Sequence, residues 1–335
     1  MNAPHPVLPA PPVAATPALA PCLIVNPRSF RASRGGLAAR ALVLGRRYGA
    51  ELIESADPAT IASGLDHALA AGPRPIFIVS GDGTVQALMD QLVARYGEAL
   101  PPILALGGGR SNLTAVDVGG GGALLAKLER ALARQRRGEA FAIEARPLLV
   151  IEQAGAPARH GFFVAGGLID AAIRDARRQR EAGDGFLRRG ALSTAWYLLK
   201  LALLALRGRS PLRAEELQID VPGMGTLRGA NRVLIATTLQ HREGLFNPYA
   251  ARGDGALRIT AIAADAPRFW RSLPGILRGR FARTLTLDSG YLSGRCTQLT
   301  VRGLLGYSLD GEAFATAPAP PVTIRTGATI RFLQP

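Results

Sequence analysis

The first third of the sequence alternates short apolar runs with helical patterns. Apolar runs that end in turn signals predict buried strands, and the longer stretches between them predict helices. Strands are expected at 22–27, 51–54, 75–79 and 102–106, and helices at 36–48, 58–71, 85–94 and 124–137. Parallel neighbours need crossover helices, so this order predicts an α/β domain with a mostly parallel sheet.

The pattern changes after residue 140, where short runs typical of antiparallel strands predominate. These strands are expected at 147–152, 160–164, 232–238, 256–263 and 298–301, with helical insertions at about 170–207 and 266–280. The chain is long enough for two domains with separate cores, so a β-rich domain is expected over 141–319. The first 21 residues are rich in Pro and Ala without Lys or Arg, and they predict a disordered tail rather than a secretory signal.

Three of the expected N-terminal strands end in turns marked by glycine or proline. Ligands of parallel sheets bind beyond the carboxyl ends of the strands. The turns at Asn26-Pro27, at Ser80 to Thr84 and at Gly107 to Asn112 should therefore meet at one rim.

The turn Ser80-Gly81-Asp82-Gly83-Thr84 combines glycines with a carboxylate. Glycines after a strand let backbone N–H groups approach phosphate oxygens. Asp82 could ligate magnesium or accept the proton of an attacking hydroxyl, both of which are tasks in phosphoryl transfer. The alternative is an Asp-Gly turn that only caps the next helix.

Two further segments carry similar chemistry. The turn from Gly107 to Asn112 suits phosphate, or it is a flexible loop followed by a helix cap. Near the C-terminus, Asp310-Gly311-Glu312 places two carboxylates around a glycine, although Asp-Gly is also a common hairpin turn. Each segment alone leaves both interpretations open.

Together these segments resemble the diacylglycerol kinase catalytic-domain family, which includes sphingosine and ceramide kinases and bacterial lipid kinases. The resemblance covers nearly the whole chain from Cys22 onward. The blocks that agree in order and spacing are Asn26-Pro27, Ser80 to Thr84, Gly108 to Ala115, Phe162 to Asp170 and Asp310-Gly311-Glu312.

This resemblance implies a nucleotide-binding domain over 22–140, to which a last segment at about 320–335 returns, and a lipid-binding domain over 141–319. It implies ATP and Mg²⁺ as cofactors and a lipid hydroxyl as acceptor, of the diacylglycerol, ceramide or sphingoid class. The catalytic residues carried over are Asp82 and Glu312, and the metal ligands are Asp82 and Asp310. The expected nucleotide-binding residues are Asn26, Pro27, Ser80, Gly81, Gly83, Thr84, Gly108, Gly109, Arg110, Ser111 and Asn112.

The sequence also departs from the family pattern. Many members have Asn-Asp after the second glycine turn, whereas Asn112 is followed by Leu113. Arg110 could contact ATP phosphates, or it could fill the nucleotide site and weaken binding. These departures keep open a catalytically weak or inactive protein that binds nucleotide or anionic lipid. A kinase for a soluble metabolite such as NAD would share the two-domain plan.

The net charge of +15 is concentrated in the second part of the chain, with +4 up to Val150 and +11 after it. An apolar stretch at 191–206 lies between arginines, and a second one around Phe269, Trp270 and Leu273 contains Arg268, Arg271, Arg278, Arg280 and Arg283. Such segments suit an anionic membrane surface, although ordinary core helices with basic ends would have the same pattern. We expect a peripheral protein at the inner face of the membrane, with no transmembrane helix.

Other compositional features exclude several classes of protein. The two cysteines, Cys22 and Cys296, have no metal-ligand spacing and indicate no disulfide framework, which favours the cytoplasm. Aromatic residues make up 6% of the chain, too few for a base-stacking platform, and no nucleic-acid-binding motif is present. A nucleic-acid partner is therefore not expected, and the sequence leaves the oligomeric state open.

Overall fold

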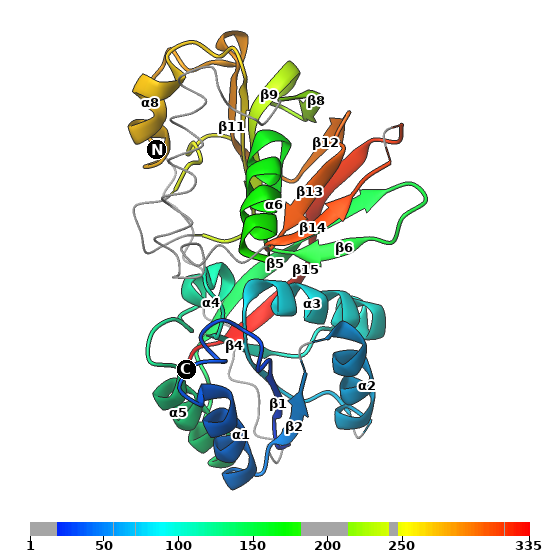
Figure 1. The fold of residues 1–335 in the computed structure, drawn as a ribbon, viewed down its shortest axis with the longest axis vertical. Helices are drawn as coiled ribbons and strands as arrows, with labels where there is room; N and C mark the ends of the chain where they lie inside the picture. The colour runs from blue at the N-terminus through cyan, green and yellow to red at the C-terminus, as the bar shows by residue number, and fades with distance from the viewer. Residues whose placement is uncertain (1–18, 56, 71, 182–213, 241–246, 318) are drawn as a thin grey trace, which may run out of the picture.

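The computed structural model describes residues 19–335 apart from 56, 71, 182–213, 241–246 and 318 (Figure 1). It confirms the expected fold class, an α/β part with a mainly parallel sheet followed by an antiparallel, β-rich part. The first part contains β1 (Cys22–Val25), α1 (Leu37–Arg47), β2 (Glu51–Glu54), α2 (Pro58–Ala68), β3 (Ile76–Ser80), α3 (Asp82–Tyr96), β4 (Ile103–Gly107), α4 (Leu113–Asp117) and α5 (Leu124–Arg136).

The second part begins with the long strand β5 and ends with the long strand β15. Its elements are β5 (Ile143–Gln153), β6 (Arg159–Gly161), β7 (Phe163–Gly166), α6 (Gly167–Glu181), β8 (Glu215–Val221), β9 (Gly225–Thr237), β10 (Leu257–Ala263), α8 (Phe269–Ile276), the 3₁₀ turn η2 (Leu287–Ser289), β11 (Tyr291–Cys296), β12 (Gln298–Arg302), β13 (Gly306–Leu309), β14 (Glu312–Ala315) and β15 (Val322–Leu333).

The N-terminal sheet has the strand order β2-β1-β3-β4, and all three pairs are parallel. Every residue of β1, β3 and β4 is buried, because helices cover both faces. Helices α1 and α5 pack on one face, and α2 and α3 pack on the other. The chain reverses its direction of winding between β1 and β3, and such a switch point is where this sheet type binds ligands.

Local sequence signals explain how these helices begin and pack. Helix α2 starts at Pro58 because the carboxylate of Asp57 accepts hydrogen bonds from the N–H groups of Ala59 and Thr60. Helix α1 lies close to the sheet at Gly45, where a Cβ atom would be 2.6 Å from side-chain atoms of both Leu23 and Leu52.

The second part is an antiparallel assembly around β9. Strand β9 pairs with β7, β8 and β10, and β10 pairs with β11. Strand β8 continues through β12 to β15, and β7 continues through β13 to β14. A single large hydrophobic cluster fills this part.

Two long strands connect the two parts (Figure 1). Strand β15 pairs with β12 at its start, with β5 along most of its length, and with β4 at Phe332. The last strand therefore reaches the N-terminal sheet, as the family resemblance implies. The domain boundaries at residues 140 and 319 stay a prediction.

Several element boundaries differ from the sequence expectations. Helix α3 begins at Asp82 rather than at residue 85, so the Asp-Gly-Thr segment forms its first turn. The strand expected at 160–164 is split at Phe162, because the backbone of this residue bonds to Asp310 and Thr237 instead of continuing one ladder. Helix α8 contains Pro274 and ends at Ile276, earlier than expected. Most of the expected insertion at 170–207, including 191–206, lies outside the described residues.

No helix among the described residues is both long and apolar enough to cross a membrane.

A glycine after α4 makes a close contact that no larger residue could make. A Cβ atom on Gly120 would lie 1.7 Å from the carbonyl oxygen of Ala105 in β4. We expect Gly120→Ala to lower the free energy of unfolding by about 1–3 kcal/mol, because the strand and the loop must separate. Urea denaturation with Gly121→Ala as control tests this, since a Cβ on Gly121 meets only a side-chain methyl of Val116 at 3.1 Å. Equal stability of the two variants would contradict the expectation.

Candidate active site

The loop after β1 binds the start of α3 through side chains. Asn26 is buried, and its Nδ2 donates a hydrogen bond of 2.7 Å to Oγ1 of Thr84. Next to the turn at Pro27, the hydroxyl of Ser29 accepts a hydrogen bond of 3.1 Å from the N–H of Gly81. The Asn-Pro block and the Gly-Asp-Gly-Thr block thus lie together at the switch point of the sheet.

The carboxylate of Asp82 joins this turn to the second glycine-rich turn. Its oxygens accept hydrogen bonds of 2.9 Å from Oγ of Ser111, 3.1 Å from the N–H of Leu113 and 3.1 Å from the N–H of Thr114. Asp82 is 8% exposed. It therefore sits in the first turn of α3 and at the same time caps the N-terminus of α4, where a negative charge is favourable.

The second glycine-rich turn is held by its own side chain. Asn112 has a φ of 51°, its Oδ1 accepts a hydrogen bond of 2.6 Å from the N–H of Gly109, and its Nδ2 donates to the carbonyl of Gly109. The N–H of Gly108 donates to the carbonyl of Ser80 at 2.7 Å. A Cβ on Gly109 would lie 2.5 Å from Cα of Gly81, so the two turns are in backbone contact.

This packing uses several of the amides that were expected to face phosphate. The N–H groups of Gly81, Gly108 and Gly109 all donate to acceptors within the protein. Arg110 follows these glycines, and its guanidinium lies 3.9 Å from the ring centre of Phe30.

The Asp310-Gly311-Glu312 segment forms the hairpin between β13 and β14 and reaches α3. A Cβ on Gly83 would lie 2.5 Å from Oε1 of Glu312, so this carboxylate lies directly over the first turn of α3. The structure thus brings Glu312 to the Gly-Asp-Gly-Thr block, across 228 residues of sequence.

Asp310 is buried and holds the break between β6 and β7. Its carboxylate accepts hydrogen bonds of 2.9 Å from the N–H groups of both Phe162 and Phe163. Burial raises the pKa of Asp310 well above its usual range, and the nearby carboxylate of Asp82 raises it further, although the two N–H donors act in the opposite direction. Its φ of 50° places it in the left-handed region of the turn.

The two residues expected to ligate a metal ion, Asp82 and Asp310, differ in how well they could do so. Among the described residues, no group of three or more His, Cys, Asp or Glu side chains could hold a metal ion. Both oxygens of Asp310 are occupied by amides in a buried site. Asp82 accepts three hydrogen bonds, and since a carboxylate has about four acceptor positions, it retains capacity for one further ligand.

Comparisons with known proteins bear on the family and the fold. Residues 21–142 match the diacylglycerol kinase catalytic domain. The match confirms, for this part of the chain, the family resemblance drawn from the sequence. No curated protein sequence matches the chain significantly.

Solved structures extend the likeness to the fold of the whole chain. Three structures from Bacillus anthracis str. Sterne, assigned as diacylglycerol kinases and in two cases only provisionally, have TM-scores of 0.65, 0.60 and 0.63. Each covers 96% of this chain and 98% of its own, at identities of 12%, 11% and 13%. At such low identity the likeness shows the fold alone.

The sequence alone did not indicate Arg31, which holds the glycine turns. The N–H of Arg31 donates to the carbonyl of Gly108 at 2.7 Å, and its guanidinium donates to the carbonyls of Gly107 and Gly122. The sequence does contain a signal for this role, because a serine and two arginines directly follow Asn26-Pro27. This loop lies at the rim of the sheet where ligands bind.

Helix α6, at the start of the helical insertion expected from residue 170, is also held by buried polar contacts. Asp170, in the first turn of α6, accepts hydrogen bonds of 2.5 Å from Ser308 and 2.6 Å from Arg174. Burial raises the pKa of Asp170, and these partners act against that shift. This carboxylate fixes α6 against β13.

Helix α3 is bound to the second part by Asp90. Its carboxylate accepts hydrogen bonds from the N–H of His160 at 2.8 Å and from Gln86 at 2.8 Å, and forms an ion pair with Arg159 at 3.2 Å. Because α3 begins at Asp82, these contacts fix the site residues relative to the hairpin that carries Glu312.

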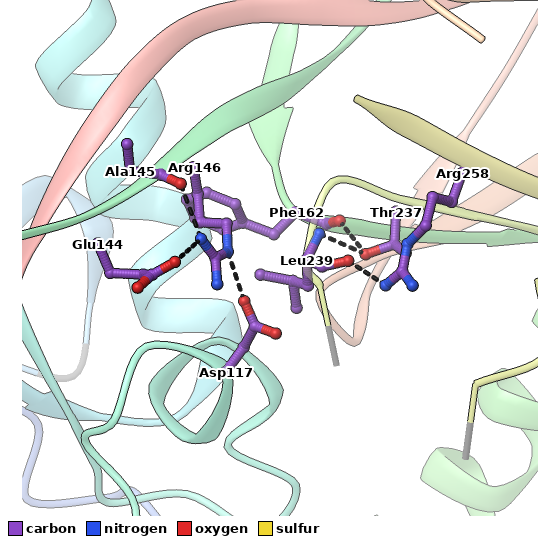
Figure 2. A network of polar contacts seen from close by, with 8 residues as sticks. All are labelled: Asp117, Glu144, Ala145, Arg146, Phe162, Thr237, Leu239 and Arg258. Carbon is purple, nitrogen blue, oxygen red and sulfur yellow. Dashed lines mark hydrogen bonds and ion pairs between the residues drawn. The ribbon is translucent and has the colours of Figure 1, made fainter. Parts of the chain in front are cut away.

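A buried ion-pair network lies on the other side of α4 (Figure 2). Nε of Arg146 is 2.6 Å from Oδ2 of Asp117, the last residue of α4, and its Nη1 is 2.5 Å from Oε1 of Glu144. The side chains of Arg146 and Asp117 are each 1% exposed. Figure 2 also shows a separate set of hydrogen bonds, in which Thr237 joins Phe162 to Leu239 and buried Arg258 donates to the carbonyl of Leu239. The two ends of α4 are thus anchored, one by Asp82 and one by Arg146.

The anchoring by Arg146 predicts a large loss of stability on truncation. We expect Arg146→Met to lower the free energy of unfolding by about 3–5 kcal/mol, because the buried carboxylate of Asp117 would lose its ion pair with Arg146. Urea denaturation measures the change. The double variant Arg146→Met with Asp117→Leu should recover part of the loss, whereas an unchanged stability of Arg146→Met would show that the pair contributes nothing.

Proposed function

We propose that this protein transfers the γ-phosphoryl group of ATP to a hydroxyl group of a lipid. The observation that supports this most is the position of Glu312 over Gly83, which joins the late Asp-Gly-Glu hairpin to the Gly-Asp-Gly-Thr turn. An acceptor on the second part and a nucleotide on the first would meet there. The acceptor belongs to the diacylglycerol, ceramide or sphingoid class.

The proposed roles of the site residues follow from their contacts. Asp82 holds the two glycine turns together, and its remaining acceptor position suits Mg²⁺, which proteins usually bind through one or two carboxylates plus phosphate oxygens and water. When bound, Mg²⁺ neutralises charge on the phosphates. Glu312 is partly exposed and takes the proton of the acceptor hydroxyl. Asp310 is assigned a positioning role, because its oxygens are already occupied.

The nucleotide would lie at the switch point between β1 and β3. Asn26, Pro27, Ser80, Gly81, Gly83, Thr84 and the turn from Gly108 to Asn112 surround this position. Their mutual hydrogen bonds make the site rigid before any ligand binds, and rigid sites lose less conformational entropy on binding.

The proposal predicts that Glu312→Gln lowers kcat for lipid phosphorylation by about 10²–10⁴-fold, because an amide cannot accept the hydroxyl proton. ATP affinity should stay unchanged. The measurement is transfer of radiolabelled phosphate from ATP into a panel of diacylglycerol, ceramide, sphingoid base and NAD, with Glu129→Gln on the exposed face of α5 as control. Asp82→Ala should also be inactive, and it should be less stable because α4 loses its cap.

Two outcomes would contradict the proposed function. Phosphorylation of NAD without any lipid product would indicate a soluble-metabolite kinase. Binding of ATP without transfer to any acceptor, in wild-type protein, would indicate an inactive member of the family.

We also propose that α8 and its flanking arginines contact an anionic membrane at the cytoplasmic face. The side chains of Arg268, Arg271, Arg278, Arg280 and Arg283 are exposed. In contrast, Phe269 is buried, and Trp270 and Leu273 pack against the core. The ring of Phe269 also packs edge to face on Trp270. The contact would therefore depend on charge rather than on inserted apolar side chains, while the segment 191–206 lies outside the described residues.

Charge-dependent contact predicts selective binding to anionic vesicles. A flotation assay should recover the protein with vesicles that contain anionic lipid and not with neutral ones. Arg271→Glu combined with Arg283→Glu should weaken binding at least 20-fold, since each basic residue near such a surface contributes about 1 kcal/mol. Arg40→Glu combined with Arg130→Glu, at exposed positions of α1 and α5, is the charge-matched control. Equal recovery with neutral and anionic vesicles would contradict the contact.

A further inference from the structure

Strand β6 lies beside both helix α3 and the β13–β14 hairpin (Figure 1). Its first residue, Arg159, has a side chain that contacts both of these elements. Nη1 of Arg159 is 3.2 Å from Oδ2 of Asp90 in α3. The same guanidinium lies over the ring of Phe314 in β14, with its carbon 5.0 Å from the ring centre. One side chain of β6 therefore connects the helix that begins at Asp82 with the strand that begins at Glu312.

Phe314 is on the same face of β14 as Glu312. Alternate residues of a strand point to the same face, and the burial of β14 follows this period. Glu312 and Phe314 are partly buried, whereas the two alanines that alternate with them are exposed. The two residues are about 7 Å apart, because a strand rises by about 3.4 Å per residue. A contact on the ring of Phe314 thus acts on the strand face that carries the Glu312 carboxylate.

The ring of Phe314 is held in place by the core of the second part. Tyr307 is its partner residue in β13, and the two rings stack with 5.4 Å between centres and 25° between planes. Tyr307 is buried in the large hydrophobic cluster. Arg174 of α6 also holds the backbone, because its Nη2 donates a hydrogen bond of 2.7 Å to the carbonyl of Phe314. The ring is therefore a defined surface on which a guanidinium can stack.

The carboxylate that binds Arg159 is also held in place. Asp90 accepts hydrogen bonds of 2.8 Å from the N–H of His160 and 2.8 Å from Nε2 of Gln86. Gln86 is buried, and its Nε2 also lies 3.2 Å from the carbonyl oxygen of His160. The side chain of Asp90 is 17% exposed. The position of Arg159 relative to α3 is therefore set by a carboxylate that is bound to the backbone of β6.

The position of Glu312 over α3 matters for the proposed proton transfer. A general base must lie within hydrogen-bond distance of the proton that it takes, and a misplacement of about 1 Å can lower the rate about 100-fold. Asp310 holds the turn before Glu312 through the N–H groups of β6 and β7 residues. Arg159 contacts the strand after it. The hairpin is thus fixed on both sides of the carboxylate.

We propose that Arg159 is a positioning residue for Glu312. By joining Asp90 of α3 to Phe314 of β14, it sets how far the Glu312 carboxylate lies from the first turn of α3. This role rests on the proposed function, in which Glu312 takes the proton of the acceptor hydroxyl. Arg159 acts through Glu312 and does not itself contact the reacting atoms.

Steady-state kinetics with the lipid panel tests this role. Arg159→Ala should lower kcat about 10–100-fold, as expected for a small displacement of a general base, and should leave the KM for ATP unchanged. Arg159→Lys keeps the charge beside Asp90 but lacks the planar group that stacks, so its kcat should lie between the two. In the Glu312→Gln background, adding Arg159→Ala should change kcat by less than about twofold, because the group that it positions is already gone.

Hydrogen exchange gives a second readout that needs no activity. The backbone N–H groups of the hairpin, residues 306–315, should exchange about three- to tenfold faster in Arg159→Ala than in the wild type. The reason is that an ion pair and a cation–π contact no longer oppose local opening. Arg95→Ala is the matched control, since Arg95 of α3 forms its ion pair with Asp66 of α2. This variant should keep the wild-type kcat and the wild-type exchange of the hairpin.

The results that would overturn the positioning role differ from those that would overturn the proposed function. Lipid phosphorylation with an unchanged kcat in Arg159→Ala contradicts the positioning role alone, and so does an equal loss of kcat in the wild-type and Glu312→Gln backgrounds. If the wild-type protein phosphorylates no lipid, the proposed function fails. Exchange then still decides whether Arg159 holds the hairpin, because an unchanged rate in Arg159→Ala would show that it does not.

Discussion

The carboxylate of Asp82 is the interaction on which the rest of the site depends. It belongs to α3 but accepts hydrogen bonds from Ser111, Leu113 and Thr114 at the start of α4. Hydrogen bonds to a charged group contribute about 1.5–3 kcal/mol each, so this one side chain fixes how two helices and two glycine turns meet. Where the two turns meet, the backbones of Gly81 and Gly109 are in contact, so neither position has room for a larger side chain.

The second constraint is that the last strand, β15, returns to the N-terminal sheet and pairs with β4. Strands β5 and β15 pair along most of their length and continue from one part into the other, so the two parts share one sheet framework. Asp90 binds α3 to β6, and the β13–β14 hairpin brings Glu312 over the first turn of α3. In the proposed reaction, a nucleotide on the first part and an acceptor on the second would be held at this common junction, which favours transfer between them.

The many arginines have distinct physical roles that composition does not separate. Arg146 is buried in an ion-pair network that anchors α4. Arg31 holds the second glycine turn through backbone carbonyls. The arginines of α8 are exposed, and those stacked on Phe30 are held by an aromatic ring. The net charge of +15 therefore includes buried arginines that hold the fold, arginines stacked on an aromatic ring and exposed arginines at the surface.

The sequence by itself determined the alternation of strands and helices in the first part, the antiparallel pattern of the second part and the family resemblance of residues 21–142. These follow from local periodicity and from short motifs, which are readable without knowing what they contact. The start of α3 at Asp82 and the break at Phe162 were missed, because both depend on hydrogen-bond partners far away in the chain. Only the tertiary structure decided that the glycine amides bind within the protein, that Asp310 is buried, and that Arg34 and Arg110 both stack on Phe30. Each of these depends on contacts between segments that are far apart in the sequence, and a local sequence pattern does not specify which distant segments will meet.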